Sequence, residues 1–338
     1  MLEIPEWPYF LDAPRASGLL RSCPEDFVVE EIPRVHPEGE GSHLWLWVEK
    51  RAANTDWVAR ELATVAGCAQ RDVGFAGLKD RHAVTRQWFS VPVTETTREG
   101  FENAEIEGVQ VLDVHKHTRK LKRGTLNGNR FHLKIRDFNG EATQTKQRMQ
   151  QIRAHGVPNY FGPQRFGHQG RNVEQGFKLL NRRARLQRNK RSIYLSAIRS
   201  FLINQVLAER VRRGSWNTII DGDLAMLDGT QSIFPCEKPD TEIEERCQRL
   251  DIHPTGPMPG EKGTQPTADA IELEQTVLQH WPELAGVLIA QRVQASRRAL
   301  RLVPAELKWS FEGSVLDLTF VLPPGTYATT VLREILVS

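Results

Sequence analysis

The sequence lacks several features that would place it in a familiar class of protein. It has only four cysteines among 338 residues, with no C-x-x-C spacing, so neither a disulfide framework nor a zinc site is expected. No apolar run approaches the ~18 residues that a membrane span requires. The N-terminal MLEIPEWPYF has no basic or apolar signal region, so we expect no export signal. These absences favour a soluble protein of the reducing cytoplasm that does not contact a membrane.

Two nucleotide-binding motifs are also missing. No G-x-G-x-x-G opens a helix, so a dinucleotide site has no support. A P-loop requires Gly-Lys followed by Ser or Thr, whereas Gly77-Leu78-Lys79-Asp80 has an acid where the phosphate and magnesium would lie. The close histidine pair, His115 and His117, lies inside a basic run, and we expect no metal there.

Charges of both signs are present in nearly equal number but are unevenly distributed. The formal net charge is +3. The run from His115 to Arg136 contains eight Lys or Arg and no acid, and the run from Lys178 to Arg191 contains seven and no acid. One such run is usually a solvated face. Two of them, each near glycines, asparagines or aromatics, indicate a surface that binds a polyanion.

The apolar pattern predicts a mixed α/β chain. Strand alternation covers Phe27–Ile32 and His43–Lys50, and a helix begins after Asn54 or Thr55 and ends at Gly67. Further helices are predicted over about Glu141–His155, Lys190–Arg213 and Ala268–Leu300, with a Pro/Gly-rich loop over Asp251–Pro266. Past Pro304 the strand pattern returns as a hairpin that turns at Glu312-Gly313. Strands at both ends and a helix-rich middle predict one sheet domain split by an insertion.

The stretch GFAGLKDRHAVTRQWFSV, Gly74 to Val91, places one carboxylate between two cations on a glycine-led turn before a strand. Lys79 and Arg81 would favour the ionised form of Asp80, and the glycines would allow the backbone to approach a ligand closely. An ionised carboxylate can act as nucleophile or base at a sugar carbon. A glycosidase usually needs a second carboxylic acid, and none is obvious here. A lone carboxylate suits a reaction that keeps the departing base and reattaches it, whereas the simpler interpretation is a turn aspartate.

Six motifs in order along the chain carry a resemblance to a known family. AGLKDRHAVTRQW resembles the signature of the TruD family of tRNA pseudouridine synthases. The other motifs, which together span almost the whole chain, are PEDFVVEEI (Pro24–Ile32), KLKRGTLNGNRF (Lys120–Phe131), GVPNYFGPQRFG (Gly156–Gly167), RNKRSIYLSAIRS (Arg188–Ser200) and LPPGTYATTVLRE (Leu322–Glu334). The resemblance implies an α/β (α+β) fold, in which a pseudouridine-synthase catalytic domain has a mixed β-sheet flanked by helices. An α/β insertion domain would interrupt it, with residues 1–153 and 304–338 forming the catalytic domain and residues 154–303 the insertion.

The resemblance also implies roles for particular residues. Asp80 would be the catalytic aspartate, and Phe27, Asn129 and Tyr327 would contact the target nucleotide. Tyr327 stands where bacterial members often have Phe, so it adds a hydroxyl. Arg21 occupies a position where a basic residue is usual. Beside these, we expect Lys79 and Phe131 to contribute to the substrate site, Lys79 through phosphate and Phe131 by stacking or as core.

The implied reaction needs no redox cofactor and no metal, because uridine and pseudouridine are isomers. Its substrate would be tRNA, with the uridine at position 13 as the expected target. The base must leave its stack, and aromatic faces can recover part of that cost. Whether Asp80 attacks C1′ or removes a proton from C2′ stays open. So do two rival functions, a non-catalytic RNA-binding protein on the same scaffold and a glycosylase. No protein partner is implied, and we expect a monomer.

Overall fold

The computed structural model describes residues 3–93, 98–182 and 185–337, and its chain folds into two compact units. Unit 1 consists of Met1–Arg15, Thr143–Val303 and Thr326–Ser338, and unit 2 consists of Ala16–Ala142 and Pro304–Gly325. The chain therefore starts in unit 1, builds most of unit 2, returns to unit 1 for residues 143–303, adds residues 304–325 to unit 2 and ends in unit 1. This confirms the predicted mixed α/β fold, with strands from both parts of the sequence in one sheet.

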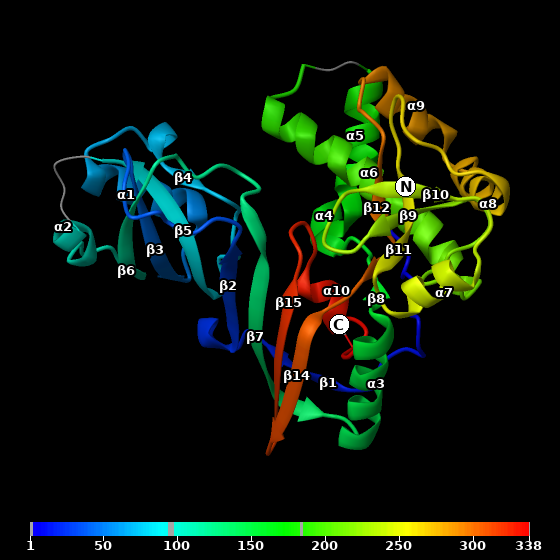
Figure 1. The fold of residues 1–338 in the computed structure, drawn as a ribbon, viewed down its shortest axis with the longest axis horizontal. Helices are drawn as coiled ribbons and strands as arrows, with labels where there is room; N and C mark the ends of the chain where they lie inside the picture. Colours follow the sequence, from blue (N-terminus) through cyan, green and yellow to red (C-terminus); the bar gives the residue numbers. More distant parts are fainter. Residues whose placement is uncertain (1–2, 94–97, 183–184, 338) are drawn as a thin grey trace. The chain divides into compact units, whose positions relative to one another are not determined.

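Unit 2 is built on a nine-stranded mixed sheet with the order β14-β15-β7-β2-β5-β3-β6, and β1 and β4 pair with β7 and β5 (Figure 1). Among the described strands of this sheet, only the β2–β5 pair is parallel. Two helices, α1 (Thr55–Ala66) and α2 (Arg98–Glu102), belong to this unit. The strands are β1 (Ser17–Leu20), β2 (Phe27–Pro33), β3 (His43–Arg51), β4 (Gly74–Phe75), β5 (Val84–Pro92), β6 (Val109–His117), β7 (Leu126–Asn139), β14 (Ala305–Glu312) and β15 (Val315–Leu322).

Helix α1 packs on the sheet next to the loop that carries Asp80. Its buried face, which includes Val58 and Leu62, packs on the apolar sides of β3 and β5 in one core cluster. The helix ends at Gly67, whose φ of 64° lies in the left-handed region that favours glycine, as the sequence predicted. After α1 the chain turns through β4 into the loop and then enters β5.

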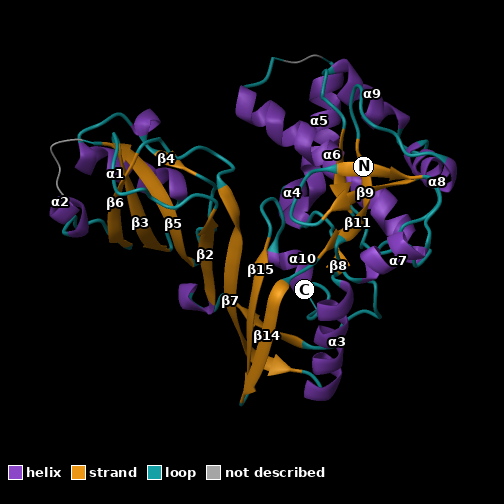
Figure 2. Ribbon diagram, in the orientation of Figure 1, coloured by secondary structure: helices purple, strands orange, loops and turns teal. Residues whose placement is uncertain are grey.

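Unit 1 is mostly helical, as Figure 2 shows, and packs around the long helix α6 (Arg188–Arg212). A four-stranded antiparallel sheet in the order β10-β9-β11-β12 lies in the same unit, together with the short pair β13-β8. The other helices are α3 (Ala142–His155), α4 (Pro163–Phe166), α5 (Arg171–Asn181), α7 (Thr241–Gln248), α8 (Ala268–Leu278), α9 (Pro282–Ala290) and α10 (Ala328–Leu332). Its strands are β8 (Val157–Pro158), β9 (Asp223–Leu227), β10 (Ile233–Cys236), β11 (Ile252–Met258), β12 (Ser296–Ala299) and β13 (Arg301–Leu302).

Both chain ends pack into unit 1, so this division differs from the expected domain bounds. Trp7 stacks on Tyr160 with ring centroids 5.7 Å apart. Arg333 donates a hydrogen bond to the carbonyl of Trp7 at 2.6 Å. The N-terminal segment and the segment after residue 325 thus contribute to the core around α6, and unit 2 receives only the hairpin β14–β15 from the C-terminal part.

Two sequence predictions in unit 1 were wrong. The segment predicted as the loop Asp251–Pro266 contains strand β11, and the predicted helix Ala268–Leu300 ends at Ala290 and gives way to β12. Strand β11 tolerates its two prolines because each of them pairs with a neighbouring strand on one side. Pro254 pairs with β9, and Pro257 pairs with β12. A missing N–H can face the side where no ladder bond is made.

Candidate active site

The carboxylate of Asp80 is held by two hydrogen bonds in the loop before β5. Arg21 donates from Nη2 to Oδ2 at 2.6 Å, and the backbone N–H of His82 donates to Oδ1 at 2.9 Å. The side chains of Asp80 and Arg21 are 32% and 34% exposed, so the pair is reachable from solvent. The bond from the guanidinium to the carboxylate is charge-assisted.

Arg21 reaches this position through an unusual backbone. Its φ of 62° is in the left-handed region, which costs free energy for a residue with a side chain. From there its guanidinium also lies over the ring of Phe27, with Cζ 4.1 Å from the ring centroid. The guanidinium of Arg21 therefore contacts both the carboxylate of Asp80 and the aromatic face of Phe27. The sequence identified Arg21 only through its resemblance and gave no sign of this geometry.

Lys79 does not pair with Asp80, contrary to the expectation from their adjacency. Its ammonium lies 2.5 Å from Oε2 of Glu31 on β2, and both side chains are buried. Glu31 also accepts the backbone N–H of Trp88 from β5 at 3.3 Å. This ion pair joins β2 to the loop. The cation that pairs with Asp80 is therefore Arg21 and not Lys79. Arg81 is exposed.

Asn129 has an unused acceptor. It lies on β7 between two strands, opposite Glu31 on β2 and Leu322 on β15. Its Oδ1 is buried and has no hydrogen-bond partner among the described residues. Such an atom costs free energy unless something donates to it.

Phe27 and Phe131 belong to one aromatic row on the buried face of the sheet. Their ring centroids are 6.2 Å apart with planes at 82°, and Phe131 stacks on Phe320 of β15 at 5.4 Å. Phe27 is 3% exposed and Phe131 is 8% exposed. The ring of Phe27 is thus covered by Arg21 and by Phe131, and a base can reach it only if the guanidinium moves. Phe131 packs as core.

Tyr327 belongs to unit 1, where it is half-buried at the start of α10. Its hydroxyl accepts a hydrogen bond from Nη2 of Arg165, and Nη1 of Arg165 donates to Ser196 Oγ at 2.8 Å. The ring of Phe161 lies next to that of Tyr327, with centroids 6.4 Å apart. The extra hydroxyl of Tyr327 therefore has a partner, from the segment GVPNYFGPQRFG.

The two glycines before Asp80 differ in what they require. A Cβ on Gly74 would lie 2.3 Å from the carbonyl oxygen of Leu121 and 2.5 Å from Ser90 Oγ, so only glycine fits there. Gly74 is in strand β4 and approaches the backbone of Leu121. Gly77 has a negative φ and ordinary space around it. The close approach of this loop to a ligand stays a prediction.

Sequence reasoning missed Glu31 and Lys50. Lys50 on β3 is 0% exposed, and its ammonium donates to the carbonyl oxygens of Ala53 at 2.7 Å and Asp80 at 2.8 Å. In the sequence, Lys50 is one cation at the end of a strand, between Glu49 and Arg51. Nothing in that pattern separates it from a solvated residue.

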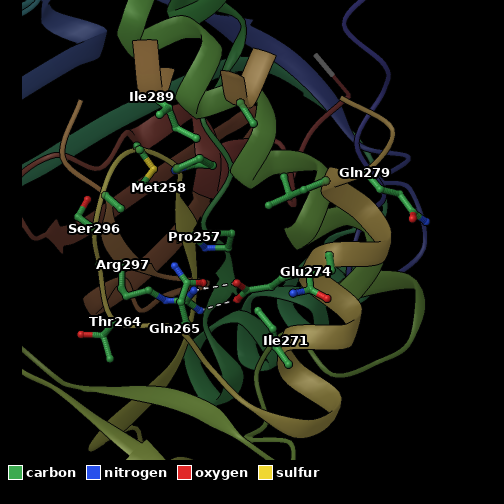
Figure 3. Close-up of a pocket in the computed structure, with 17 residues that line it drawn as sticks. Pro257, Met258, Thr264, Gln265, Ile271, Glu274, Gln279, Ile289, Ser296 and Arg297 are labelled. Atoms are coloured by element: carbon green, nitrogen blue, oxygen red, sulfur yellow. Dashed lines mark hydrogen bonds and ion pairs between the residues drawn. The ribbon is translucent and has the colours of Figure 1, made fainter. Parts of the chain in front are cut away.

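A cavity of about 430 Å³ lies elsewhere, between α8, α9 and β12 of unit 1 (Figure 3). The buried side chains of Glu274 and Arg297 point toward each other within its lining and form two hydrogen bonds, at 2.6 and 2.9 Å. Arg297 also binds Thr255 twice, so its donors are used within the protein. None of the predicted site residues lines this cavity.

The described residues contain no group of three or more His, Cys, Asp or Glu placed to hold a metal ion. In the same part of the chain, no helix combines the length and the apolar character needed to cross a bilayer.

Comparisons with known proteins place this site in a family. The family model for tRNA pseudouridine synthase D (TruD) matches residues 5–186 and 183–335. The tRNA pseudouridine synthase D of Methylococcus capsulatus is 46% identical over 98% of this chain and 96% of its own length. That of Nitrosococcus oceani is 44% identical over 96% and 92%. The crystal structure of a Methanosarcina mazei protein assigned as tRNA pseudouridine synthase D has the same fold, with a TM-score of 0.74 at 22% identity, over 97% of this chain and 95% of that one.

The fold and the family are those of a pseudouridine synthase, an enzyme of the isomerase class. The chain belongs to the TruD family of tRNA pseudouridine synthases, as its motifs indicated.

Proposed function

We propose that this protein converts uridine to pseudouridine in tRNA, with position 13 as the expected target and Asp80 as the catalytic residue. The observation that carries this proposal is the solvent-accessible carboxylate of Asp80, held by Arg21, whose guanidinium also lies over the ring of Phe27. The reaction breaks the C1′–N1 bond, turns the base and joins C1′ to C5. The proton at C5 leaves and N1 gains one, so the product is an isomer. A single anionic group at the sugar is what such a reaction needs, either to attack C1′ or to take the C2′ proton.

We propose roles for the other residues that the resemblance assigns to the target nucleotide. The flipped uracil would replace the guanidinium of Arg21 on the ring of Phe27, and stacking there is worth ~1–3 kcal/mol. Asn129 would accept the N3–H of the base through its Oδ1. Tyr327 of unit 1 would also contact the target nucleotide, as the resemblance implies. Lys79 and Phe131 would support the site indirectly. Lys79 would do so through its ion pair with Glu31, and Phe131 through its packing against Phe27.

The remaining parts of the proposal concern the wider setting. The protein would act on tRNA as a monomer in the cytoplasm, where its four free cysteines fit a reducing environment. The catalytic domain would comprise residues 1–153 and 304–338, with residues 154–303 as the insertion domain. Exposed basic side chains would contact phosphates and position the tRNA.

A tritium-release assay with C5-labelled uridine in tRNA tests the function directly. We expect Asp80→Asn to abolish release and to leave tRNA affinity within a few-fold, because size and hydrogen bonding are kept and only the negative charge is lost. Asp72→Asn in the preceding segment is the matched control and should stay active. Turnover near wild type in Asp80→Asn would return Asp80 to the role of a turn aspartate. Release of free uracil by the wild type would indicate a glycosylase. Binding of tRNA by the wild type without tritium release would indicate an RNA-binding protein.

Mapping pseudouridine in tRNA tests the target. Cells that lack the protein should have uridine at position 13, and the same cells complemented with the wild-type chain should recover pseudouridine there. Complementation by Asp80→Asn should fail. Loss of pseudouridine at another position would correct the target and leave the enzyme class unchanged.

A further inference from the structure

Three buried polar side chains hold the main chain of the loop that carries Asp80. Gln87 of β5 donates to the carbonyl of Gly77 at 3.1 Å, and the N–H of Lys79 donates to Thr55 Oγ1 at 3.0 Å. Lys50 of β3 donates to the carbonyl of Asp80 at 2.8 Å. These three side chains are at most 2% exposed and come from three different elements, β5, α1 and β3. All act on backbone atoms, so they set the path of the loop.

Apolar packing holds this loop at its ends, where Ala76 is 3% and Ala83 is 0% exposed, so its middle depends on such hydrogen bonds. Leu78 is 63% exposed, and a cavity of about 330 Å³ lies against Leu78 and Lys79 on the side of α1. A loop next to open space can shift unless polar bonds fix it. A displacement of the carboxylate by about 1 Å can cost on the order of a hundred-fold in rate, so the position of this backbone decides the activity of Asp80.

Lys50 is the only charged member of the three. Its ammonium lies in the interior of the sheet domain, where ionised groups are disfavoured unless they are bound. It is bound by two carbonyl oxygens, those of Ala53 and Asp80. A methionine would fill similar space but would leave the carbonyls of Ala53 and Asp80 without this donor, so Lys50 supplies a charged hydrogen-bond donor to the loop that carries Asp80.

We propose that Lys50 is a positioning residue of the isomerase, which fixes the catalytic carboxylate by binding the main-chain carbonyl of Asp80 and supplies positive charge beneath it. This inference rests on the proposed role of Asp80. It adds a residue that acts through the backbone and touches no substrate.

The charge on Lys50 gives the proposal a measurable signature. Burial lowers the pKa of Lys50 to about 8; the nearby charge of Asp80 opposes this shift, and that of Lys79 adds to it. The charged groups that face it are therefore Asp80 and Lys79 and, through Lys79, Glu31 of β2. As the pH rises through 8, the amine loses its charge, and a neutral donor binds a carbonyl less strongly. We expect kcat to fall about five-fold on the alkaline side.

Protein stability should respond in the opposite direction. The pKa of Lys50 is lower in the folded state than in the unfolded chain, so its contribution to stability is lost as the pH falls through 8 and grows as the pH rises above 8. A purely structural lysine would give activity that follows stability. A positioning lysine makes activity fall while its own contribution to stability rises.

The experiment measures kcat and KM for tRNA between pH 6 and 9.5, with melting temperatures at each pH, for three proteins. We expect Lys50→Met to lower kcat about ten- to hundred-fold, with KM nearly unchanged and the alkaline fall abolished. Gln87→Met removes a neutral bond to the same loop and is the matched control. It should lower kcat while the alkaline fall remains.

Three results would overturn the proposal. They are a Lys50→Met variant with at least half the wild-type kcat, a Lys50→Met variant that keeps the alkaline fall, and a wild-type kcat that shows no fall above pH 8. The last result needs no variant and contradicts the proposal even if Lys50→Met does not fold. None of these results affects the Asp80→Asn test, so the two proposals fail separately.

Discussion

Arg165 donates a hydrogen bond to the hydroxyl of Tyr327 and holds it at the start of α10. The guanidinium is itself fixed by Ser196 of α6 and lies 5.1 Å from the ring centroid of Phe161. The aromatic ring proposed to contact the target base is therefore oriented by an arginine of the segment GVPNYFGPQRFG.

This bond predicts that Tyr327→Phe is not silent. The ring survives but loses its fixed orientation, so kcat should fall about two- to ten-fold with tRNA affinity unchanged. Arg165→Met should have a similar effect, and the double variant should be little worse than either single one, because both remove the same bond. Tyr9→Phe, which removes a bond to Glu6 at the surface, is the control. Additive losses would mean that Arg165 and Tyr327 act independently.

Asn129→Ala should lower kcat/KM about 5- to 150-fold, because the uracil N3–H would be left without its acceptor. The melting temperature should stay near wild type, since the buried Oδ1 has no partner to lose within the described residues. Asn127 lies two residues earlier on the same strand and is exposed, so Asn127→Ala is a suitable control for activity. A large fall in melting temperature with Asn129→Ala would assign the residue to the sheet rather than to the base.

The exposed residues Arg119 and Lys122 should contribute to tRNA binding, since neither forms an ion pair within the part of the chain that the structure describes. Replacing both with Gln should lower the slope of log K against log salt by roughly 0.7–0.9 per phosphate contact. The matched control replaces Arg130 and Lys134, which pair with Glu306 and Asp317.

An unchanged slope in the Arg119/Lys122 variant would mean that the basic run His115–Arg136 is a solvated surface that does not contact the tRNA phosphates. The second basic run, Lys178–Arg191, is open to the same test at Arg182 and Arg185, which are exposed. Arg183 of that run lies outside the described residues.

Glu334 should make the protein less stable as the pH rises. It is 0% exposed, and burial raises its pKa to about 7, although Arg333 opposes the shift. A carboxyl whose folded-state pKa is raised contributes stability that is complete below its unfolded pKa and is lost as the pH rises through 7. Relative to Glu334→Gln, the wild type should therefore lose roughly 3 kcal/mol between pH 4.5 and 8. Urea unfolding at several pH values measures this difference, and the exposed Glu312→Gln should show none. A flat difference for Glu334→Gln would contradict a buried, protonated carboxyl.

The parts of the fold that depend on local pattern were predictable. Helix α1 followed from its apolar face and the stop at Gly67, and the hairpin β14–β15 from strand alternation around Gly313. Strand β11 was not predictable, because its two prolines are acceptable only next to the partners β9 and β12, which the sequence does not show. A local sequence pattern predicts a single helix or strand, whereas strand pairing depends on two strands that can lie far apart in the sequence.

The candidate site divides in the same way. Asp80 could be found because chemistry requires a carboxylate and the motif surrounds it with distinctive neighbours. Its true partners could not, because Arg21 comes from a segment 59 residues earlier and Lys50 from the interior of β3. Lys79, the neighbour in sequence, turns to Glu31 instead. Adjacency along the chain was a poor guide to which cation meets the carboxylate.

Strand β7 has a consequence for how the protein is made. It pairs with β2 on one side and with β15 on the other, and β15 is translated only after residues 143–303 have been added. On the ribosome, that interval lasts roughly ten to thirty seconds. During it Asn129 lacks its β15 neighbour and one edge of the nascent sheet stays open to pairing with other chains. Arg130 and Lys134 lie along β7 and pair in the finished protein with Glu306 and Asp317 of the hairpin, and such charges discourage association at an open edge. The basic residues of β7 would thus protect the unfinished polypeptide before their acidic partners in the C-terminal hairpin arrive.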